Sequence, residues 1–403
     1  MPVLWYWVID MNIMEMDRSY VAGTYNRFPV ELVSGKGSRL VDTQGKTYVD
    51  MGSGIGVTAF GIADDAWQAA VTAQLGKVQH TSNLYYTEPC AKLARLLCEK
   101  TGMKKVFFSN SGAESNECAI KVARGYSAKT KGPHCYTIVT LVNSFHGRTL
   151  TTLAATGQDH FHKLFQPLTP GFVHVPANDV EALRQAVAEN FVAGIMIECI
   201  QGEGGVNPLT PEFVKEVEKI CQEQDIPMMV DEVQTGNGRT GALYAYQNYG
   251  VTPDIVSTAK GLGGGLPIGA TMMSEKVQNV LGFGDHGSTY GGNPVCCAGA
   301  ISILERMDDK FLAGVKERSD YIFAALEGAE GVESVTGMGL MVGIKTVAPA
   351  AAVVKACMEK GVLCLTAKDK IRLLPALNIP MEDLTFAVET IKAAAKELGG
   401  KEV

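Results

Sequence analysis

The sequence predicts an α/β protein with a mainly parallel, doubly wound sheet and a second, smaller α+β domain. From residue 101 to about residue 273, short apolar runs alternate with helical patterns, which is the order typical of parallel sheets. A chain of 403 residues is also too long for one ordinary hydrophobic core, so we expect two domains. The expected strands are 106–108, 137–142, 193–198, 228–233, 255–259 and 270–273, with helices over 180–189 and 211–224.

Elements of a different kind flank this region. Turn signals at 34–38 and 42–46 border two short runs, 39–41 and 47–50, and predict a β-hairpin. A helical pattern follows Pro294 to about residue 307, and the strand candidates after it are 341–344, 362–365 and 371–374. We therefore expect an N-terminal arm and hairpin over 1–63 that packs with the small domain and a partner subunit, a large domain over 64–308, and a small domain over 309–403.

Composition excludes several classes of protein. The net charge of -7 and the charged share of 20% give no basic surface for nucleic acid. Ten cysteines without a CxxC pair favour reduced core residues of a cytoplasmic protein, and the histidines, including His160 and His162, lack metal-ligand spacing, so no metal is expected. The apolar opening 1–9 is too short to span a bilayer and has no basic start, so it is either an arm on a partner subunit or a stretch before a later start of translation. The alternative starts to Met1 are Met11, Met14 and Met16.

Lys260 is a lone amine at the end of an apolar strand, where the chain enters the glycine-rich loop 261–265. Burial among apolar and small residues lowers the pKa of a lysine, and an amine that attacks a carbonyl cofactor must be deprotonated. The alternative is a solvated lysine at a strand end. The choice between them depends on the neighbouring motifs.

Asp231 directly follows four apolar residues, at the end of the strand expected to bring ligands to the carboxyl edge of the sheet. A carboxylate in that position needs a cationic partner, and a protonated pyridine nitrogen is one. Further upstream, Ser111 to Glu114 has the pattern of a capping box that opens a long helix, and Gly112 would let an anion approach the free amides. An ordinary capped helix explains the same letters. An amine, an acid and an anion site together match pyridoxal phosphate.

Further polar residues follow the other strands. Phe145 could stack on the pyridine ring, and Arg148 could bind a carboxylate with its planar guanidinium, although a surface arginine beside a packed aromatic is the alternative. Glu198 and Glu203 sit at another strand end, where we expect one of them to have no role. Arg372 by itself would be a strand charge facing water. The stretch 286–294 offers the hydroxyls of Ser288 and Thr289 to a phosphate of its own or a neighbouring subunit.

One motif points to a different cofactor. Residues 236–241 spell GNGRTG, the glycine spacing of a dinucleotide-binding loop. Such a site needs an acidic residue about twenty positions after the glycines, on the next strand. Asp231 precedes the glycines and Asp254 lies in a turn after Pro253, so we reject this interpretation.

Taken in order, the motifs resemble those of the class III aminotransferases, of the pyridoxal-phosphate fold type I group. The resemblance covers the chain from about Tyr25 to Leu377. The motifs that carry it are FFSNSGAESNECAIKVAR (107–124), FHGRT (145–149), ECIQGEGGV (198–206), VDEVQTGNGRTG (230–241), the AKG that contains Lys260, and HGSTYGGNP (286–294).

The resemblance implies a role for each cofactor residue in a homodimer. Lys260 would form the Schiff base with pyridoxal 5'-phosphate and Asp231 would pair with the pyridinium nitrogen. Gln234 would bind the ring hydroxyl. The ring would lie between Val233 and Phe145, and the phosphate would be bound by Ser111, Gly112, Ala113 and, from the other subunit, Thr289.

The resemblance also implies the reaction. Arg148 would bind a substrate carboxylate, Ser288 would contact substrate, and Glu203 would mask Arg372 until 2-oxoglutarate or glutamate binds. The expected reaction is transfer of the terminal amino group of N2-acetyl-L-ornithine to 2-oxoglutarate. The sequence departs from the family's pattern at 60–65, near the expected substrate entrance, and at Thr336, where an arginine is common. Ornithine, succinylornithine and 4-aminobutyrate therefore stay alternative donors. Two other classes are an aminomutase and a non-catalytic homologue.

Overall fold

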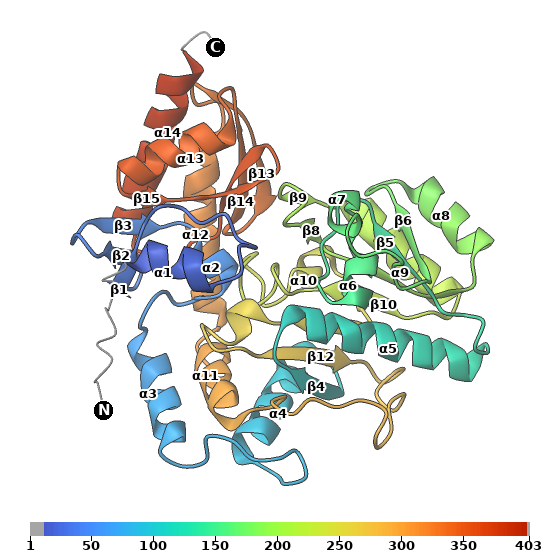
Figure 1. Ribbon diagram of the computed structural model, residues 1–403. Helices are drawn as coiled ribbons and strands as arrows, with labels where there is room; N and C mark the ends of the chain where they lie inside the picture. Colours follow the sequence, from blue (N-terminus) through green and yellow to red (C-terminus); the bar gives the residue numbers. More distant parts are fainter. Residues whose placement is uncertain (1–11, 401–403) are drawn as a thin grey trace, which may run out of the picture.

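The computed structural model describes residues 12–400 and has a seven-stranded sheet at its centre (Figure 1). The strand order is β4-β12-β11-β10-β7-β5-β6; neighbours from β11 to β6 are parallel, whereas β12 is antiparallel to β11 and β4. The predicted mainly parallel sheet is therefore confirmed. Its strands are β4 Lys105–Ser109, β5 Thr137–Leu141, β6 Phe172–Val175, β7 Val192–Ile197, β10 Met228–Asp231, β11 Ile255–Thr258 and β12 Gly269–Met273.

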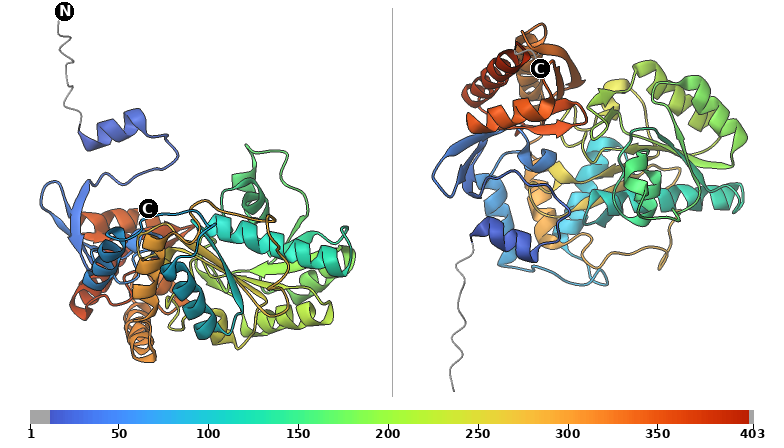
Figure 2. Two further views of the ribbon diagram at one scale, coloured as in Figure 1. Left: turned by 90° about the horizontal axis from the view of Figure 1, so that it is seen from below. Right: turned by 45° about the horizontal axis from the view of Figure 1, so that its top comes forward.

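Helices cover both faces of this sheet. The long helix α5 (Gly112–Thr130) packs against β7, β11 and β12, whereas α9 (Pro211–Glu223) packs against β7 and β10. Figure 2 shows α5 and α9 on opposite sides of the strands. Because both faces are covered, β7, β10, β11 and β12 are buried along their whole length, which explains their continuous apolar runs.

The parallel strands deliver their following loops to one edge of the sheet. Strands β5, β7, β10 and β11 are mutual neighbours in the order β11-β10-β7-β5. The loop with Phe145 and Arg148 follows β5, Glu198 follows β7 and Lys260 follows β11, whereas Asp231 is the last residue of β10. Positions that are up to 115 residues apart therefore meet at this edge, which is where ligands bind in such sheets.

The N-terminal strands join a strand from the far end of the chain. β1 (Leu32–Lys36), β2 (Arg39–Asp42) and β3 (Thr47–Asp50) form an antiparallel meander, and β15 (Val362–Leu363) pairs parallel to β3. The predicted hairpin is confirmed as β2-β3, but the expected turn at 34–38 is wrong in part, because 34–36 extends the sheet as strand β1. The meander lies beside the C-terminal elements in Figure 1.

A second sheet, of order β13-β14-β17-β16, forms the centre of the C-terminal part. The predicted strand 362–365 divides in two, because Val362–Leu363 pairs with β3 whereas Leu365 pairs with Arg372 in β17. Around this sheet lie three helices. The bounds are β13 Val332–Met338, β14 Met341–Thr346, β16 Leu365–Ala367, β17 Lys370–Leu373, α12 Asp309–Leu326, α13 Ala350–Glu359 and α14 Met381–Gly399. The division into 1–63, 64–308 and 309–403 stays a prediction.

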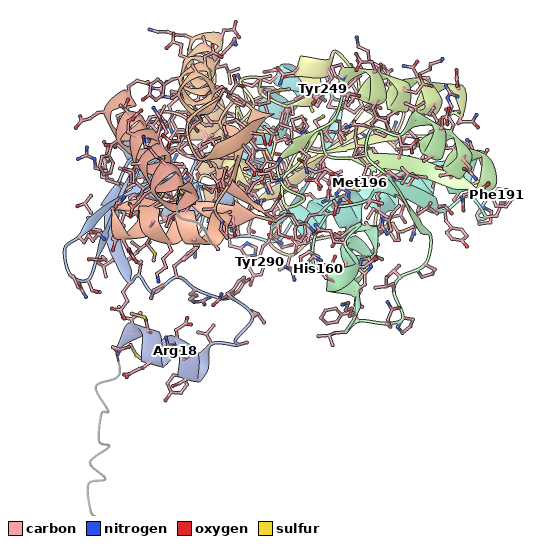
Figure 3. The ribbon with its side chains drawn as sticks, turned by 90° about the horizontal axis from the view of Figure 1, so that it is seen from above. Arg18, His160, Phe191, Met196, Tyr249 and Tyr290 are labelled. Carbon is pink, nitrogen blue, oxygen red and sulfur yellow. The ribbon has the colours of Figure 1, made fainter. Side chains whose placement is uncertain are left out.

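The first described helix, α1 (Ile13–Tyr20), buries none of its residues and projects from the two sheets (Figures 2 and 3, where Arg18 is labelled), although Asp17 pairs with Arg27 and the amide of Met14 donates to Glu31. Of the alternative translation starts, Met14 and Met16 lie in α1, and Met1, Met11 and the apolar stretch 1–9 lie outside the described residues.

The other elements are α2 Ser53–Gly56, α3 Asp65–Leu75, α4 Glu88–Thr101, α6 Leu150–Ala155, α7 Asp159–His162, α8 Val180–Glu189, β8 Ile200–Gln201, β9 Asn207–Pro208, α10 Tyr246–Tyr249, the 3-10 turn η1 Lys260–Leu262 and α11 Pro294–Leu304. Between residues 12 and 400, no helix is both long enough and apolar enough to cross a membrane.

Candidate active site

Lys260 lies at the carboxyl edge of the central sheet, two residues after the end of β11. Its backbone is left-handed, with φ +45, a conformation that costs energy for a residue with a side chain. Burial lowers the pKa of its amine; the carboxylate of Glu203 opposes this effect and Arg372 reinforces it. Within residues 12–400, the side-chain amine of Lys260 has no hydrogen-bond or ion-pair partner. The structure therefore presents an amine that is easily deprotonated and free to react.

Asp231 ends strand β10 and is 4% exposed. Its Oδ2 accepts hydrogen bonds from His146 Nδ1 at 2.8 Å and Asn116 Nδ2 at 2.7 Å, and its Oδ1 accepts from the amide of Val233 at 3.0 Å. These donors stabilise a buried carboxylate. Asp231 was expected to need a cationic partner, and His146 supplies part of that positive charge from within the protein.

Sequence reasoning missed His146 and Asn116. Burial opposes a charge on His146, but the hydrogen bond and the negative charge of Asp231 outweigh it and raise the pKa of the imidazole. Nε2 of His146 is buried and has no partner in the described part of the chain. His146 belongs to the FHGRT motif, so its spacing from Phe145 and Arg148 was the available signal. No sequence signal pointed to Asn116, because only the fold brings it to Asp231.

Helix α5 begins at Gly112 with Ser111 as its N-cap, whose hydroxyl accepts from the amide of Glu114 at 3.2 Å. The predicted capping box is wrong in its second half: the Glu114 carboxylate accepts from the amide of Asn110 at 2.5 Å, one residue before the cap. The amides of Gly112 and Ala113 have no acceptor among residues 12–400 and are available to an anion.

Gly112 is also required for packing. A Cβ at this position would lie 2.5 Å from Cγ1 and 2.9 Å from Cγ2 of Val233. The helix start and Val233, two residues after Asp231, therefore lie so close together that no side chain fits between them.

Glu198 is buried and connects two loops of the site. Its Oε1 accepts from the amide of Phe145 at 2.8 Å, and its Oε2 accepts from the amide of Gly202 at 3.2 Å. Burial raises the pKa of Glu198 to about 7, helped by the nearby Asp231 and opposed by His146. Glu198 therefore has a structural role in binding the loop that carries Phe145, and the expectation that one of Glu198 and Glu203 has no role with substrate stays a prediction.

Glu203 and Arg372 form a salt bridge of 2.6 Å between Oε1 and Nη1. Arg372 Nη1 also donates to Gln234 Oε1 at 3.2 Å, and Gln234 Nε2 donates to Glu203 Oε1 at 3.4 Å. Taken by itself, Arg372 was expected to face water, but its side chain is 4% exposed because β17 is an inner strand of the small sheet. The salt bridge thus connects the small sheet to the turn between β8 and β9.

Most of the predicted residues line one cavity of about 440 Å³. They are Ser111, Gly112, Ala113, Phe145, Arg148, Asp231, Val233, Gln234 and Lys260. Ser288 and Thr289 are not among them: they line a separate hollow with His80, Asn83 and Phe107, where Ser288 Oγ accepts from Asn110 Nδ2 at 3.0 Å. The single chain therefore does not bring these two hydroxyls to Lys260.

The motif 236–241 does not open a helix. The next helix is α10, and the guanidinium of Arg239 is buried, where its Nη1 donates to the carbonyls of Leu340 at 3.1 Å and Pro375 at 2.5 Å. A dinucleotide site needs a helix start directly after the glycines. The rejection of that cofactor is consistent with this geometry.

The cavity fits a phosphorylated pyridine aldehyde. It offers the free amine of Lys260 to an aldehyde, the acid Asp231 to a ring nitrogen, and the free amides of Gly112 and Ala113 to a phosphate. The side chain of Val233 lines it as well, and the ring of Phe145 supplies an aromatic wall.

Comparison with known proteins agrees with this assignment. Residues 20–395 match the family model for aminotransferase class III. The acetylornithine aminotransferase of Haemophilus ducreyi is 48% identical over 96% of this chain and 99% of that protein. The acetylornithine aminotransferase of Caldanaerobacter subterraneus is 44% identical over 95% of this chain and 98% of that protein.

Solved structures show the same fold. The ornithine aminotransferase from Toxoplasma gondii, crystallised with partial occupancy of PLP at its active site, has a TM-score of 0.91 at 31% identity and covers 96% of this chain and 94% of its own. The N-acetylornithine aminotransferase from Stenotrophomonas maltophilia has a TM-score of 0.82 at 33% identity, over 95% and 98%. The chain therefore belongs to the class III aminotransferases, enzymes of fold type I that depend on pyridoxal 5'-phosphate.

Proposed function

We propose that this enzyme transfers the terminal amino group of N2-acetyl-L-ornithine to 2-oxoglutarate, giving N-acetyl-L-glutamate 5-semialdehyde and L-glutamate, a step of arginine biosynthesis. The choice of donor is supported by the relatives named acetylornithine aminotransferase at 48% and 44% identity. The structural observation that carries the proposal is the Glu203–Arg372 salt bridge, which is hydrogen-bonded to Gln234, a residue of the cavity lining.

The salt bridge supports a reaction with two unlike substrates. Glu203 is 29% exposed, whereas Arg372 is 4% exposed, so the acid is free to move and the guanidinium is not. With Glu203 in place, no α-carboxylate can pair with Arg372, and a donor must enter by its terminal amine. When Glu203 moves away, Arg372 binds the α-carboxylate of 2-oxoglutarate or glutamate.

Arg148 supplies the second carboxylate site. Its guanidinium is exposed at the edge of the cavity and has no hydrogen bond or ion pair within residues 12–400. A donor whose α-carboxylate pairs with Arg148 has its terminal amine directed towards Lys260.

When bound, pyridoxal 5'-phosphate supplies an amine-reactive aldehyde and a ring that takes up the electrons of a carbanion. Lys260 Nζ moves a proton from the reacting carbon of the substrate, which its lowered pKa favours. Asp231, fixed by His146, Asn116 and the amide of Val233, holds negative charge at the ring nitrogen. The phosphate is bound by Gly112 and Ala113 at the start of α5, with the hydroxyl of Ser111 beside them.

We further propose a homodimer in the cytoplasm. Ser288 and Thr289 lie outside the cavity of their own chain, which supports a role in the neighbouring active site. The ten free cysteines are compatible with a reducing compartment.

A panel of donors tests the proposal. The purified enzyme with pyridoxal 5'-phosphate is mixed with acetylornithine, succinylornithine, ornithine, 4-aminobutyrate or lysine, and the loss of the cofactor's absorbance band is followed before 2-oxoglutarate is added. We expect the highest kcat/KM with acetylornithine and glutamate formation after 2-oxoglutarate. A clear preference for 4-aminobutyrate or ornithine would refute the donor, and turnover without any 2-oxo acid would identify an aminomutase.

A further inference from the structure

Arg148 is held by two aromatic rings. Its guanidinium carbon lies 4.0 Å from the ring centroid of Phe161 and 5.6 Å from that of Phe145. Since no other side chain among residues 12–400 pairs with Arg148, all of its N–H donors stay available to a ligand. An arginine that is fixed by ring faces keeps its orientation without using the donors that a carboxylate needs.

The ring of Phe161 is fixed in turn by a short local unit. Phe161 belongs to α7, beside the labelled His160 in Figure 3, and α7 follows α6, which begins two residues after Arg148. The next residue, His162, is buried, and its Nε2 contacts the carbonyl oxygens of Leu153 at 2.9 Å and Thr156 at 2.8 Å, at the end of α6. This anchor sets the position of α7 relative to α6.

Phe161 also contacts the wall of the cofactor cavity. Its ring meets that of Phe145 edge to face, with centroids 5.8 Å apart and an interplanar angle of 68°. Phe161 thus touches both the aromatic wall of the cavity and the guanidinium at its edge. The side chains around Phe161 carry positive charge. The pKa of the neighbouring His160 is lowered by burial and also by the charges of Lys368, Arg148 and Lys163. A ligand drawn to this group would be an anion.

We propose that Phe161 is a positioning residue for the donor's carboxylate: its ring holds the guanidinium of Arg148 at the edge of the cavity, in the orientation that binds that carboxylate. This inference rests on the proposed role of Arg148. Phe161 itself does not touch the reacting atoms. An arginine side chain that moves freely in solvent would lose rotamer freedom when it binds the carboxylate. Because the ring of Phe161 already fixes Arg148, it raises the affinity for the donor without changing the chemical step.

The test compares donors with and without the carboxylate. Phe161→Leu removes the ring face but keeps an apolar side chain, and we expect the KM for acetylornithine to rise about three- to fivefold with kcat unchanged. Phe161→Tyr, which keeps the face, should restore the wild-type KM. Leu164→Ser, two residues after the end of α7 and 88% exposed, controls for a change in this segment alone. With N-acetyl-1,4-diaminobutane, the donor that lacks only the α-carboxylate, Phe161→Leu and wild type should have equal kcat/KM.

Two outcomes overturn the inference. One is an equal loss of kcat/KM with both donors, which would give Phe161 a general packing role. The other is a further rise in KM when Phe161→Leu is added to Arg148→Met, since the ring should matter only while the guanidinium is present. If Phe161→Leu does not fold, as judged by circular dichroism, Phe161→Met takes its place. If the donor panel selects another amino acid, that compound and its decarboxylated form replace the pair, so failure of the donor assignment is distinguishable from failure of this inference.

Discussion

Nη1 of Arg372 lies 2.6 Å from Oε1 of Glu203, and this salt bridge joins an inner strand of the small sheet to the turn between β8 and β9. Arg372 also leaves one buried donor, Nε, without a partner in the described chain. Burial acts to raise the pKa of Glu203, but the charge and hydrogen bond of Arg372 outweigh it and lower the pKa. The acid is therefore ionised at neutral pH and keeps the guanidinium neutralised until another carboxylate replaces it.

Glu203→Gln should change which substrate the enzyme prefers. An uncompensated buried guanidinium binds any carboxylate that can reach it, so we expect kcat/KM for glutamate to rise about tenfold and the ratio of acetylornithine to glutamate to fall. The two half-reactions are measured separately by stopped-flow absorbance. Glu212→Gln, on the exposed face of α9, is the control and should leave the ratio unchanged. Unchanged kinetics with glutamate would mean that Glu203 does not mask Arg372.

Lys260→Ala should abolish turnover, because none of the other described residues that line the cavity has an amine to react and to move the proton. The variant should still bind pyridoxal 5'-phosphate, but reversibly, and gel filtration should remove the cofactor. The measurements are the absorbance spectrum before and after gel filtration and the rate of glutamate formation. Full activity in this variant would falsify the assignment of Lys260.

Asp231→Asn keeps the shape of the side chain but removes its charge. We expect kcat to fall about a hundredfold or more, because a neutral amide cannot stabilise a positive ring nitrogen. The loss of the carboxylate should also lower the pKa of His146, which NMR of a histidine-labelled sample can follow. Asp320→Asn, at an exposed acid of α12, should alter neither quantity. A variant with normal kcat would show that the ring nitrogen needs no anion.

Glu198→Gln should change how stability depends on pH. Burial raises the pKa of Glu198 to about 7, above its value in the unfolded chain, so the folded state binds the proton more tightly. The stability from this group is fully present below the unfolded pKa and is lost as the pH rises towards 7.

Glutamine does not titrate, so the free energy of unfolding of the variant relative to wild type should increase by about 1–3 kcal/mol between pH 5 and pH 8. Denaturant titrations at several pH values measure this difference. Burial also raises the pKa of Glu232 to about 7, but that effect is common to both proteins and cancels. Parallel curves for the two proteins would mean that Glu198 is ionised throughout.

Gly112→Ala should disturb both packing and cofactor binding. The added Cβ would lie 2.5 Å from Cγ1 of Val233, so either the start of α5 or Val233 must shift. We expect a loss of about 1–3 kcal/mol in stability and weaker binding of pyridoxal 5'-phosphate. Gly76→Ala is the matched control: its φ is -75 and the nearest atom to the added Cβ is 3.6 Å away. A neutral Gly112→Ala would show that the helix start tolerates a side chain.

Much of the cofactor site could be predicted because it depends on local pattern. Lys260 and Asp231 each end an apolar run, and the glycines and the N-cap around Gly112 announce a helix start. Parallel strands place their carboxyl ends at one edge, so residues that end such strands meet there whatever their separation in sequence. The alternation of apolar runs with helical stretches therefore determined the sheet and the edge at which the cavity forms.

Only the tertiary structure decided which side chains face each other at that edge. Arg372 is 169 residues from Glu203, and nothing near it in sequence shows that β17 is an inner strand that excludes water. Likewise, His146 and Asn116 reach Asp231 from a loop and a helix, and Phe161 reaches Arg148 through the anchored turn of α6 and α7. Such contacts depend on how whole elements pack, because a side chain a few ångströms long can pair only with what packing brings within its reach.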